Sequence, residues 1–202
     1  MTTLILLAAG ASSRMGAVNK LLLPLGDSTV LQQTLAAALA SEVDEVWVVT
    51  GHESERVEAV LQPLGVHFVY NPAYEKGMTS SIQAGVRASG INTGAYLICP
   101  GDMPYLKPAH INLLIQQFNA LDGQPGILAP VHNGKRGHPV LFSKHFRDEI
   151  LAHTDPDGCK GIIQRHAGQL MLVEVENEGI LHDIDTPEAY TSARNKKDQH
   201  GS

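Results

Sequence analysis

The sequence predicts a single α/β domain built on a mostly parallel sheet with an inserted β-hairpin. Through the first half of the chain, apolar runs of strand length alternate with stretches of helical periodicity, an order typical of parallel sheets. The first run, Leu4 to Leu7, is continuously apolar, as expected of a strand covered by helices on both faces. The Asn133-Gly134 pair lies between two short apolar segments and predicts the hairpin.

Each element of this fold follows from a local pattern. We expect strands at 4–7, 45–50, 66–70, 94–99 and 170–175, the last one in the core, and hairpin segments at 126–131 and 137–142. We expect a first helix that is capped by Ser28 or Thr29 and runs to Leu39. We expect further helices around 57–61, from about 79, over 108–120, 143–152 and 158–167, and from Pro187, with Thr186 as N-cap. Because the chain is polar from Asn195, we expect one domain at residues 1–194 and a frayed tail at 195–202.

The composition narrows the class of protein. With 202 residues, 43% of them hydrophobic, the chain is able to bury a sizeable core. A net charge of −6 and the lack of a basic run before the last few residues argue against nucleic acid, so we expect small-molecule partners. The apolar run at 4–9 is too short for a signal peptide or a membrane span, which favours a cytoplasmic protein without a membrane partner. Cys99 and Cys159 lie far apart without metal-ligand spacing, and we expect reduced thiols used in packing.

A loop of small residues follows the first strand. Ala8, Ala9 and Gly10 leave main-chain N–H groups uncovered, so a ligand is able to approach the backbone closely. Arg14 and Lys20 add the positive charge that a polyphosphate needs. These features predict a phosphate-binding element, with an ordinary strand-to-helix turn and solvated cations as the alternative.

The spacing excludes two familiar phosphate-binding loops. Five residues separate Gly10 from Gly16, which does not fit a P-loop, and Ser12 stands where a dinucleotide fingerprint needs glycine. The loop instead resembles the signature of the nucleotidyltransferases with a glycosyltransferase-A-like fold, which reads Leu-Ala-Ala-Gly, Arg-Met-Gly and then Lys. The resemblance implies a Rossmann-like domain in which Leu7, Ala8, Ala9, Gly10, Arg14 and Lys20 bind the nucleotide, and in which Arg14 and Lys20 also act in catalysis.

Two later segments offer carboxylates. Asp102 lies in a proline-stiffened, exposed loop after the strand at 94–99, where an Asx-turn is the alternative role. Asp183 and Asp185 share one face of an extended segment, which helix capping does not explain. Both segments resemble metal-binding motifs of the same nucleotidyltransferases. The resemblance implies a Mg²⁺ ion held by Asp102 and Asp185, with Asp102 also a catalytic residue.

The loop after the strand at 66–70 carries Gly-Met-Thr-Ser-Ser at 77–81. Ligands of open α/β sheets bind at this edge, although helix capping by the hydroxyl groups is the alternative. The arrangement resembles the base-side loop of the molybdenum cofactor nucleotidyltransferases. The resemblance implies nucleotide contacts from Gly77, Met78, Ser80, Ser81, Pro100, Gly101 and Asp102.

Residues 132–142 and the loop at 154–161 resemble the acceptor side of the molybdenum cofactor cytidylyltransferases. The resemblance implies that the acceptor is bound by Lys135, Arg136, Gly137, His138 and Lys160. The second loop departs from the family pattern because Lys160 stands where arginine is usual, which keeps the charge but loses the bidentate geometry. For His138, a role in packing or in a turn is the alternative.

Together these motifs imply transfer of a nucleoside monophosphate. A terminal phosphate on the acceptor is ionised at neutral pH and is itself the nucleophile, so no general base is required. Ala9 stands where guanylyl enzymes typically have glycine, and its methyl group fills space that a purine would use. We therefore expect a Mg²⁺-dependent enzyme that joins CMP from CTP to the terminal phosphate of molybdopterin, with a molybdenum hydroxylase as a partner that receives the product.

Two alternatives stay open. One is a sugar-phosphate or alditol-phosphate nucleotidyltransferase of the same fold, against which the segment 132–142 argues. The other is a non-catalytic accessory protein that delivers the cofactor to a molybdenum hydroxylase. The joint presence of Arg14, Lys20, Asp102 and Asp185 disfavours this second alternative, because a carrier has no need of two metal carboxylates.

Overall fold

The computed structural model describes residues 1–16 and 18–200 and has the predicted mixed α/β architecture. Its main sheet contains β1 (Thr2–Ala8), β4 (Glu45–Thr50), β5 (His67–Tyr70), β6 (Ala95–Pro100), β7 (Ile127–His132), β8 (Lys135–Arg136), β9 (Val140–Ser143) and β10 (Leu170–Glu174). A small second sheet pairs β2 (Pro24–Leu25) with β3 (Ser28–Thr29). The helices are α1 (Val30–Leu39), α2 (Ser54–Leu61), α3 (Met78–Ala88), α4 (Pro108–Asn119), α5 (Arg147–Ala152), α6 (Lys160–Arg165) and α7 (Pro187–His200).

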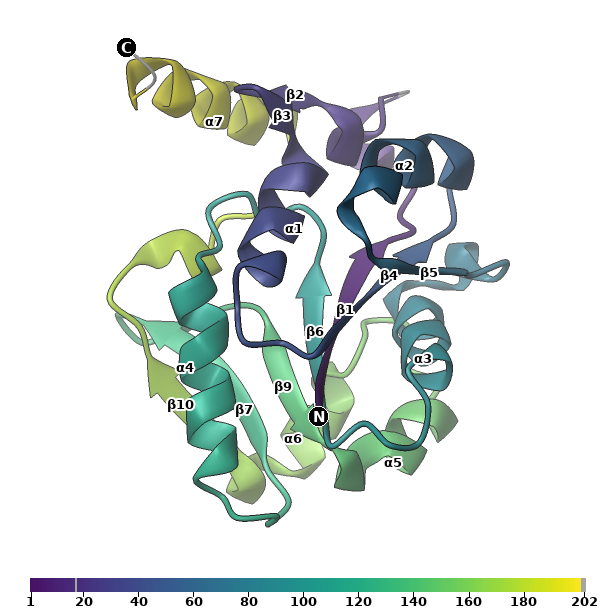
Figure 1. Ribbon diagram of the computed structural model, residues 1–202, viewed down its shortest axis with the longest axis vertical. Coiled ribbons are helices and arrows are strands. Elements are labelled where there is room, and N and C mark those ends of the chain that lie inside the picture. Colours follow the sequence, from purple (N-terminus) through teal and green to yellow (C-terminus); the bar gives the residue numbers. More distant parts are fainter. Residues whose placement is uncertain (17, 201–202) are drawn as a thin grey trace.

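Strand β1 lies near the middle of the sheet, whose order is β10-β7-β9-β6-β1-β4-β5. It pairs in parallel with β4 on one side and with β6 on the other (Figure 1). The predicted hairpin interrupts the parallel pattern, because β9 runs antiparallel between β6 and β7. At the turn from β7 to β8, Asn133 and Gly134 both have positive φ, of 50° and 76°, as a tight hairpin turn requires.

Helices cover both faces of the sheet, as the continuously apolar first strand predicted. Leu4 and Leu6 lie in a buried cluster with residues of α1, α2 and α4. Ile5, between them in sequence, lies in a second cluster with residues of α3, α5 and α6. Successive side chains of a strand point to opposite faces, so both faces of β1 are buried. Figure 1 shows the sheet between these two helical layers.

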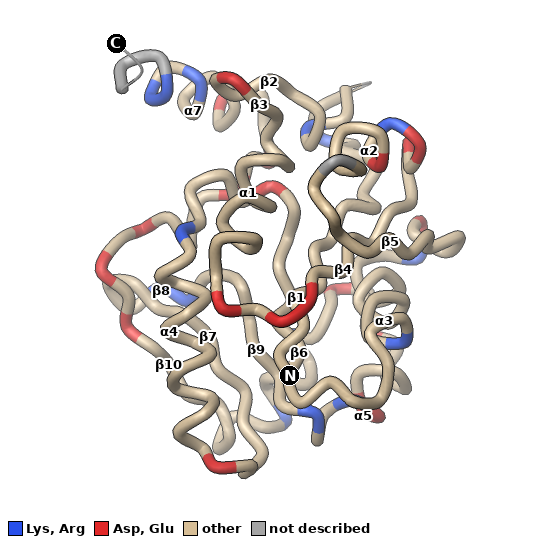
Figure 2. Tube along the Cα trace, viewed as in Figure 1, with Lys and Arg blue, Asp and Glu red and all other residues tan. Residues whose placement is uncertain are grey.

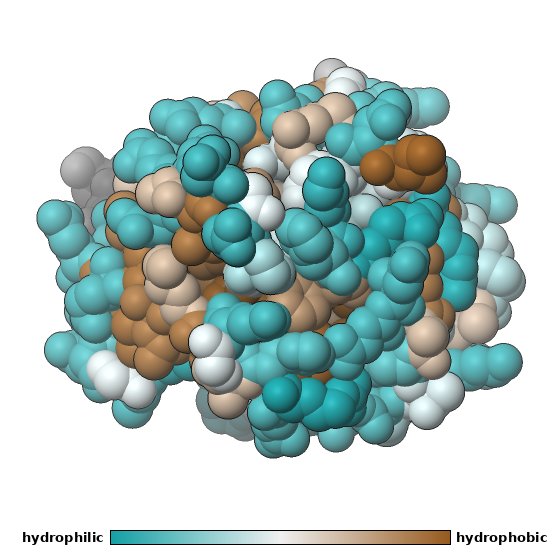
Figure 3. Space-filling model, turned by 90° about the horizontal axis from the view of Figure 1, so that it is seen from below, coloured by the Kyte–Doolittle hydropathy of each residue, from teal (hydrophilic) through white to brown (hydrophobic). Residues whose placement is uncertain are grey.

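The strand predicted at 170–175 is an edge strand and not the core strand that we expected. β10 pairs only with β7, and Met171 and Leu172 are 36% and 54% exposed. Among its residues Val173 is buried and Leu170 is partly buried, because within the described residues β10 has a neighbouring strand on one side alone. Figure 3 shows the molecule from below, where apolar atoms reach the surface in patches among hydrophilic ones.

The final helix begins as predicted but extends further. The hydroxyl of Thr186 accepts a hydrogen bond from the Ala189 amide at 3.2 Å and caps α7. The helix continues to His200, so the stretch 195–200 is helical and not the frayed tail expected, while residues 201–202 lie outside the described residues. Ala193 is buried with Leu25, which anchors the helix beyond its first turns. The division into a domain at 1–194 and a tail stays a prediction.

The charged residues are dispersed. Figure 2 shows short acidic and basic stretches scattered over the trace of the chain. None of the helices within residues 1–16 and 18–200 is long and apolar enough to cross a membrane.

The close packing of α3 on the sheet gives a stability prediction. A Cβ atom added to Gly85 would lie 2.4 Å from Cγ2 of Ile5 and 3.0 Å from Cγ2 of Val49, both fully buried. We expect Gly85→Ala to lower the free energy of unfolding, because overpacking costs about 1–3 kcal/mol while helix propensity returns about 1 kcal/mol at most. Urea unfolding measures the change. Gly168→Ala is the control, since nothing lies within 4 Å of its added Cβ; equal midpoints for the two variants would contradict the packing described here.

Candidate active site

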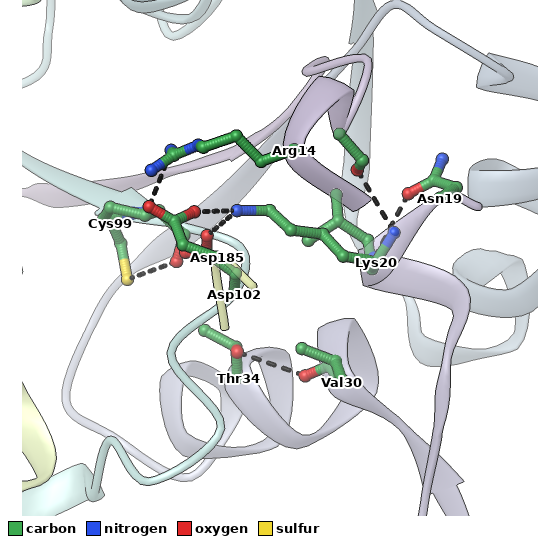
Figure 4. Close-up of polar contacts among 11 residues, drawn as sticks. Arg14, Asn19, Lys20, Val30, Thr34, Cys99, Asp102 and Asp185 are labelled. Carbon is green, nitrogen blue, oxygen red and sulfur yellow. Dashed lines mark hydrogen bonds and ion pairs between the residues drawn. The ribbon is translucent and has the colours of Figure 1, made fainter. Parts of the chain in front are cut away.

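The loop after β1 folds back and fixes the base of the Lys20 side chain. Ser12 adopts the left-handed conformation, with φ of 52°, and its hydroxyl accepts a hydrogen bond from the Lys20 amide at 3.1 Å. Asn19 is 5% exposed, and its side-chain oxygen accepts a hydrogen bond from the Leu21 amide at 3.1 Å. Figure 4 shows the Asn19 side chain beside Lys20, at the start of the short 3-10 turn Lys20–Leu22. Neither Ser12 nor Asn19 was assigned a role by the sequence analysis.

The ammonium group of Lys20 pairs with the carboxylates of both Asp102 and Asp185. Arg14 reaches Asp185 as well, with 2.6 Å between a guanidinium nitrogen and Oδ2. Asp102 follows β6 and Asp185 precedes α7, and Figure 4 shows Lys20 pointing between them. The Ile184 amide donates to the Asp102 carbonyl at 3.0 Å and holds the two segments together. Four of the residues predicted to act in catalysis or metal binding therefore meet at one point.

Asp102 is buried and does not lie in the exposed loop that we expected. It is 7% exposed. The amide of Gly101 donates to the carbonyl of Leu7 at 2.9 Å, and a Cβ atom at Gly101 would lie only 2.8 Å from that oxygen. Glycine thus lets the turn lie directly on the end of β1, which covers the aspartate.

A third carboxylate, Asp183, joins Asp102 and Asp185. One oxygen from each of the three lies within 4.8 Å of the others. Asp183 is the most exposed of the three, yet partial desolvation raises its pKa, and the charges of Asp185 and Asp102 raise it further. Oδ1 of Asp102 is buried without a hydrogen-bond partner among the described residues. A divalent cation would relieve the repulsion and satisfy this oxygen, so the carboxylates fit a hard metal ion. The metal set predicted from the sequence omitted Asp183, although its two-residue spacing from Asp185 was the signal for it.

The cations of the site balance these carboxylates. Burial alone would lower the pKa of Lys20, but the pairs with Asp102 and Asp185 outweigh burial and hold the pKa above its ordinary value. For Asp185, burial raises the pKa, and the pairs with Lys20 and Arg14 outweigh it and lower the pKa. Fixed positive and negative charges therefore lie side by side at neutral pH, which suits anionic phosphates accompanied by a metal cation.

The first cavity, of about 250 Å³, lies where β1 and β6 end. Its lining includes most of the predicted nucleotide contacts, namely Leu7, Ala9, Gly10, Lys20, Gly77, Met78, Ser81, Pro100, Gly101 and Asp102. Tyr74 and Leu21 also line it and were not predicted. The second cavity adjoins it, shares Gly10, Lys20, Gly77 and Met78 with it, and is lined further by Arg14 and Asp185.

Besides Arg14, which lines the second cavity, two predicted nucleotide contacts, Ala8 and Ser80, do not line the first cavity. Ala8 is 1% exposed and packs in the core, because its side chain points away from the neighbouring Ala9. The Ser80 hydroxyl lies 2.8 Å from the carbonyl oxygen of Ala73 and 2.9 Å from that of Gly77, so it donates to its own loop. Ala8 and Ser80 therefore pack behind the residues that line the cavity.

The third cavity, of about 260 Å³, contains most of the predicted acceptor side. Arg136, Gly137, His138 and Lys160 line it together with the apolar Ile82, Ile98, Val140, Phe142 and Ile163. Lys135 does not line it, contrary to the prediction. Lys135 and Arg136 are neighbours on β8, and consecutive strand residues point to opposite sides.

His138 is partly buried, lines the third cavity and is influenced by the charge of Asp183. Burial lowers the pKa of its imidazole, and the charge of Asp183 opposes that effect without reversing it. The ring is therefore neutral at pH 7, and its Nδ1 is buried with no partner among the described residues. The His138 amide donates to the Ile180 carbonyl at 3.0 Å, which ties the third cavity to the segment that leads to Asp183.

Both cysteines are free and buried, as predicted. Burial raises the pKa of the Cys159 thiol to about 12, so the thiol stays protonated at neutral pH. Cys159 also lines the third cavity, whereas the sequence analysis gave it a packing role alone.

The sequence and the fold both match known proteins. Residues 4–170 match the family model of the MobA-like NTP transferase domain. The chain is 30% identical over 193 residues to the molybdenum cofactor cytidylyltransferase of Escherichia coli, covering 95% of each, and 30% identical over 206 residues to the purine catabolism protein PucB of Bacillus subtilis, covering 94% of each. A nucleotidyl transferase from Methanothermobacter has a solved structure that superposes with a TM-score of 0.85 at 26% identity, covering 99% of each chain. The family model matches most of the chain, and the site gathers carboxylates and cations beside the first cavity; the chain belongs to the MobA-like NTP transferase family and is a nucleotidyltransferase.

Proposed function

We propose that this nucleotidyltransferase transfers CMP from CTP to the terminal phosphate of molybdopterin in a Mg²⁺-dependent reaction. The observation that carries the proposal is the position of the carboxylate cluster. Lys20 and Asp102 line the first cavity, and the charge of Asp183 acts on His138, which lines the third. Two phosphorylated substrates in these cavities would therefore meet beside the same carboxylates.

The reaction needs only one bond to form and one to break. An ionised oxygen of the acceptor phosphate attacks the α-phosphorus of CTP, and the bond from that phosphorus to the bridging oxygen of pyrophosphate breaks. Pyrophosphate leaves with the electron pair, and no proton has to move. In this reaction Arg14 and Lys20 stabilise the charge that develops on pyrophosphate.

The metal ion in this proposal is Mg²⁺, held by Asp102, Asp183 and Asp185. When bound, it supplies positive charge to phosphate oxygens. Carboxylate oxygens with room for substrate phosphates suit Mg²⁺, which rarely has an all-protein shell. Lys20 pairs with two of the three carboxylates in the structure and is positioned to exchange part of that contact for phosphate oxygens.

The choice of CTP as donor rests on the shape of the first cavity. Ala9 is 3% exposed and lines the cavity beside Tyr74. A Cβ atom at Gly51 would lie 2.8 Å from Tyr74 and 2.9 Å from Cβ of Ala9. The backbone of Gly51 therefore packs tightly against both side chains, and neither is able to move toward it to make space for a larger base. A purine base would have to displace the Ala9 methyl group.

The choice of molybdopterin as acceptor rests on the third cavity. Its cations, Arg136 and Lys160, suit a phosphate, while its apolar residues suit a flat ring system more than a sugar or an alditol. The cytidylyltransferase of Escherichia coli, whose name states its link to the molybdenum cofactor, supports this choice. A sugar-phosphate or alditol-phosphate acceptor is the second candidate.

A non-catalytic delivery role accounts less well for the site, since a carrier does not need three clustered carboxylates. A cytoplasmic location and a molybdenum hydroxylase as recipient of the product stay predictions. Pyrophosphate release from CTP in a single turnover with Mg²⁺ and molybdopterin tests the whole proposal. Release with a sugar phosphate alone, or binding of CTP without release, would favour one of the alternatives.

The first prediction concerns the metal. Asp102→Asn keeps the shape of the side chain and removes its charge, so we expect kcat to fall about 100-fold or more, as when a group that stabilises the transition state is lost. Steady-state pyrophosphate release at saturating CTP measures kcat, and a thermal melt separates catalysis from folding. Asp148→Asn is the control, because this carboxylate is 97% exposed and distant in the fold. Near-normal turnover in Asp102→Asn would contradict the proposal that Asp102 holds the metal ion.

The second prediction concerns the base. We expect Ala9→Gly to raise kcat/KM for GTP about tenfold, the scale on which one methyl group discriminates in an apolar pocket, with CTP less affected. Competition between the four nucleotides measures the preference. Ala11→Gly makes the same change in the exposed loop outside the first cavity. An unchanged preference in Ala9→Gly would assign base selection to other groups.

The third prediction concerns the acceptor. We expect Lys160→Met or Arg136→Gln to raise the KM for molybdopterin several-fold and to leave CTP binding nearly unchanged, because each removes a solvent-exposed, charge-assisted phosphate contact. Lys135→Met is the matched control, since Lys135 does not line the third cavity. Separate titrations with molybdopterin and with CTP measure the two effects. A fall in CTP affinity in place of acceptor affinity would assign these cations to the triphosphate.

A further inference from the structure

We propose that Thr79 is a positioning residue that holds the loop at 153–159 in place for acceptor binding. Its buried hydroxyl joins this loop to the first turn of α3, which borders the first cavity. The effect on the acceptor rests on the proposed function, whereas the effect on the loop does not.

The hydroxyl of Thr79 makes two hydrogen bonds to the same loop. It accepts from the Gly158 amide at 3.1 Å and donates to the Asp155 carbonyl. Thr79 is 5% exposed. The sequence analysis considered its hydroxyl a helix cap, but the N-cap of α3 is Gly77 and no side chain caps it. Thr79 therefore uses its one hydroxyl on a segment far away in the sequence.

The two segments approach so closely that glycine is needed on both sides. A Cβ atom at Gly77, where φ is 100°, would lie 2.9 Å from the carbonyl oxygen of Pro156. A Cβ atom at Gly158, where φ is 70°, would lie 3.0 Å from the sulfur of Met78. A shift of the loop would therefore disturb the Met78 side chain, and a shift of α3 would disturb the loop.

The residues on either side of these contacts line the cavities. Met78 lines the first, second and third cavities. Asp157, Cys159 and Lys160 line the third. The Thr79 hydroxyl thus connects the wall of the first cavity to the part of the chain that carries Lys160. Without it, Lys160 and Cys159 would lose their fixed position while β1 and its loop would not.

The test compares Thr79→Val with Thr79→Ser. Valine matches the shape of threonine but leaves the Asp155 carbonyl and the Gly158 amide unpaired, whereas serine is able to keep both bonds. Thr34→Val is the control for loss of a buried threonine hydroxyl: Thr34 is fully buried and donates within α1 to Val30 at 3.2 Å (Figure 4). Melting temperatures verify that each variant folds.

Two measurements read the position of the loop and its consequence. Amide hydrogen exchange at Gly158 and Cys159 is expected to accelerate about tenfold or more in Thr79→Val, because the bond that protects the loop is gone. The KM for molybdopterin is expected to rise about threefold or more, with the Kd for CTP and Mg²⁺ changed less than about twofold. Thr79→Ser is expected to restore both quantities, and Thr34→Val to change neither.

The outcomes separate this proposal from the proposed function. Unchanged exchange in Thr79→Val would overturn it, and so would faster exchange with an unchanged KM or with an equal loss of CTP affinity. If the wild-type protein does not use molybdopterin, the proposed acceptor is wrong. In that case, the exchange measurement and the KM for the acceptor that is used still decide the role of Thr79.

Discussion

The register of β1 against its two parallel neighbours determines where the site lies. Because β1 pairs with β4 and β6, the carboxyl ends of three strands meet at one edge, and the segments that leave them have to share it. The Gly101 amide bonds to the Leu7 carbonyl and continues the pairing of β1 with β6 one step beyond the strands. Asp102 follows directly, and Lys20 returns to it from the loop after β1. The charge cluster is thus a consequence of strand pairing as much as of loop sequence.

The ion pairs of this cluster are better explained by chemistry than by stability. The side chains of Lys20 and Asp102 are 16% and 10% exposed, and charge pairs so removed from water typically contribute little net stabilisation, because desolvation offsets their attraction. The third carboxylate, Asp183, is exposed to solvent, but partial desolvation and two like charges still raise its pKa. An apolar cluster would stabilise the fold at least as well. The arrangement is explained if a metal ion and phosphates bind to it and compensate its charges.

Much of the fold and of the site could be predicted from the sequence, because those parts depend on local patterns. The apolar run of β1, the turn at Asn133 and the cap at Thr186 are all encoded by neighbouring residues, and the structure confirms them. The errors share a different cause. Neither the burial of Asp102 nor the exposure of β10 is visible locally, because each depends on which elements happen to lie alongside. The role proposed for Thr79 likewise depends on a loop 76 residues away.

The separation of the first and third cavities has a physical consequence for the proposed reaction. Two substrates that both carry phosphates repel each other, and the repulsion is greatest when the nucleophilic oxygen approaches the α-phosphorus. Cations in one cavity alone would compensate the negative charge of one substrate and leave the charge of the other uncompensated. Here Arg14 and Lys20 line one cavity next to Met78, and Arg136 and Lys160 line another cavity next to the same residue. Charge compensation from both directions, around a carboxylate cluster able to hold a metal ion, is what such an encounter requires.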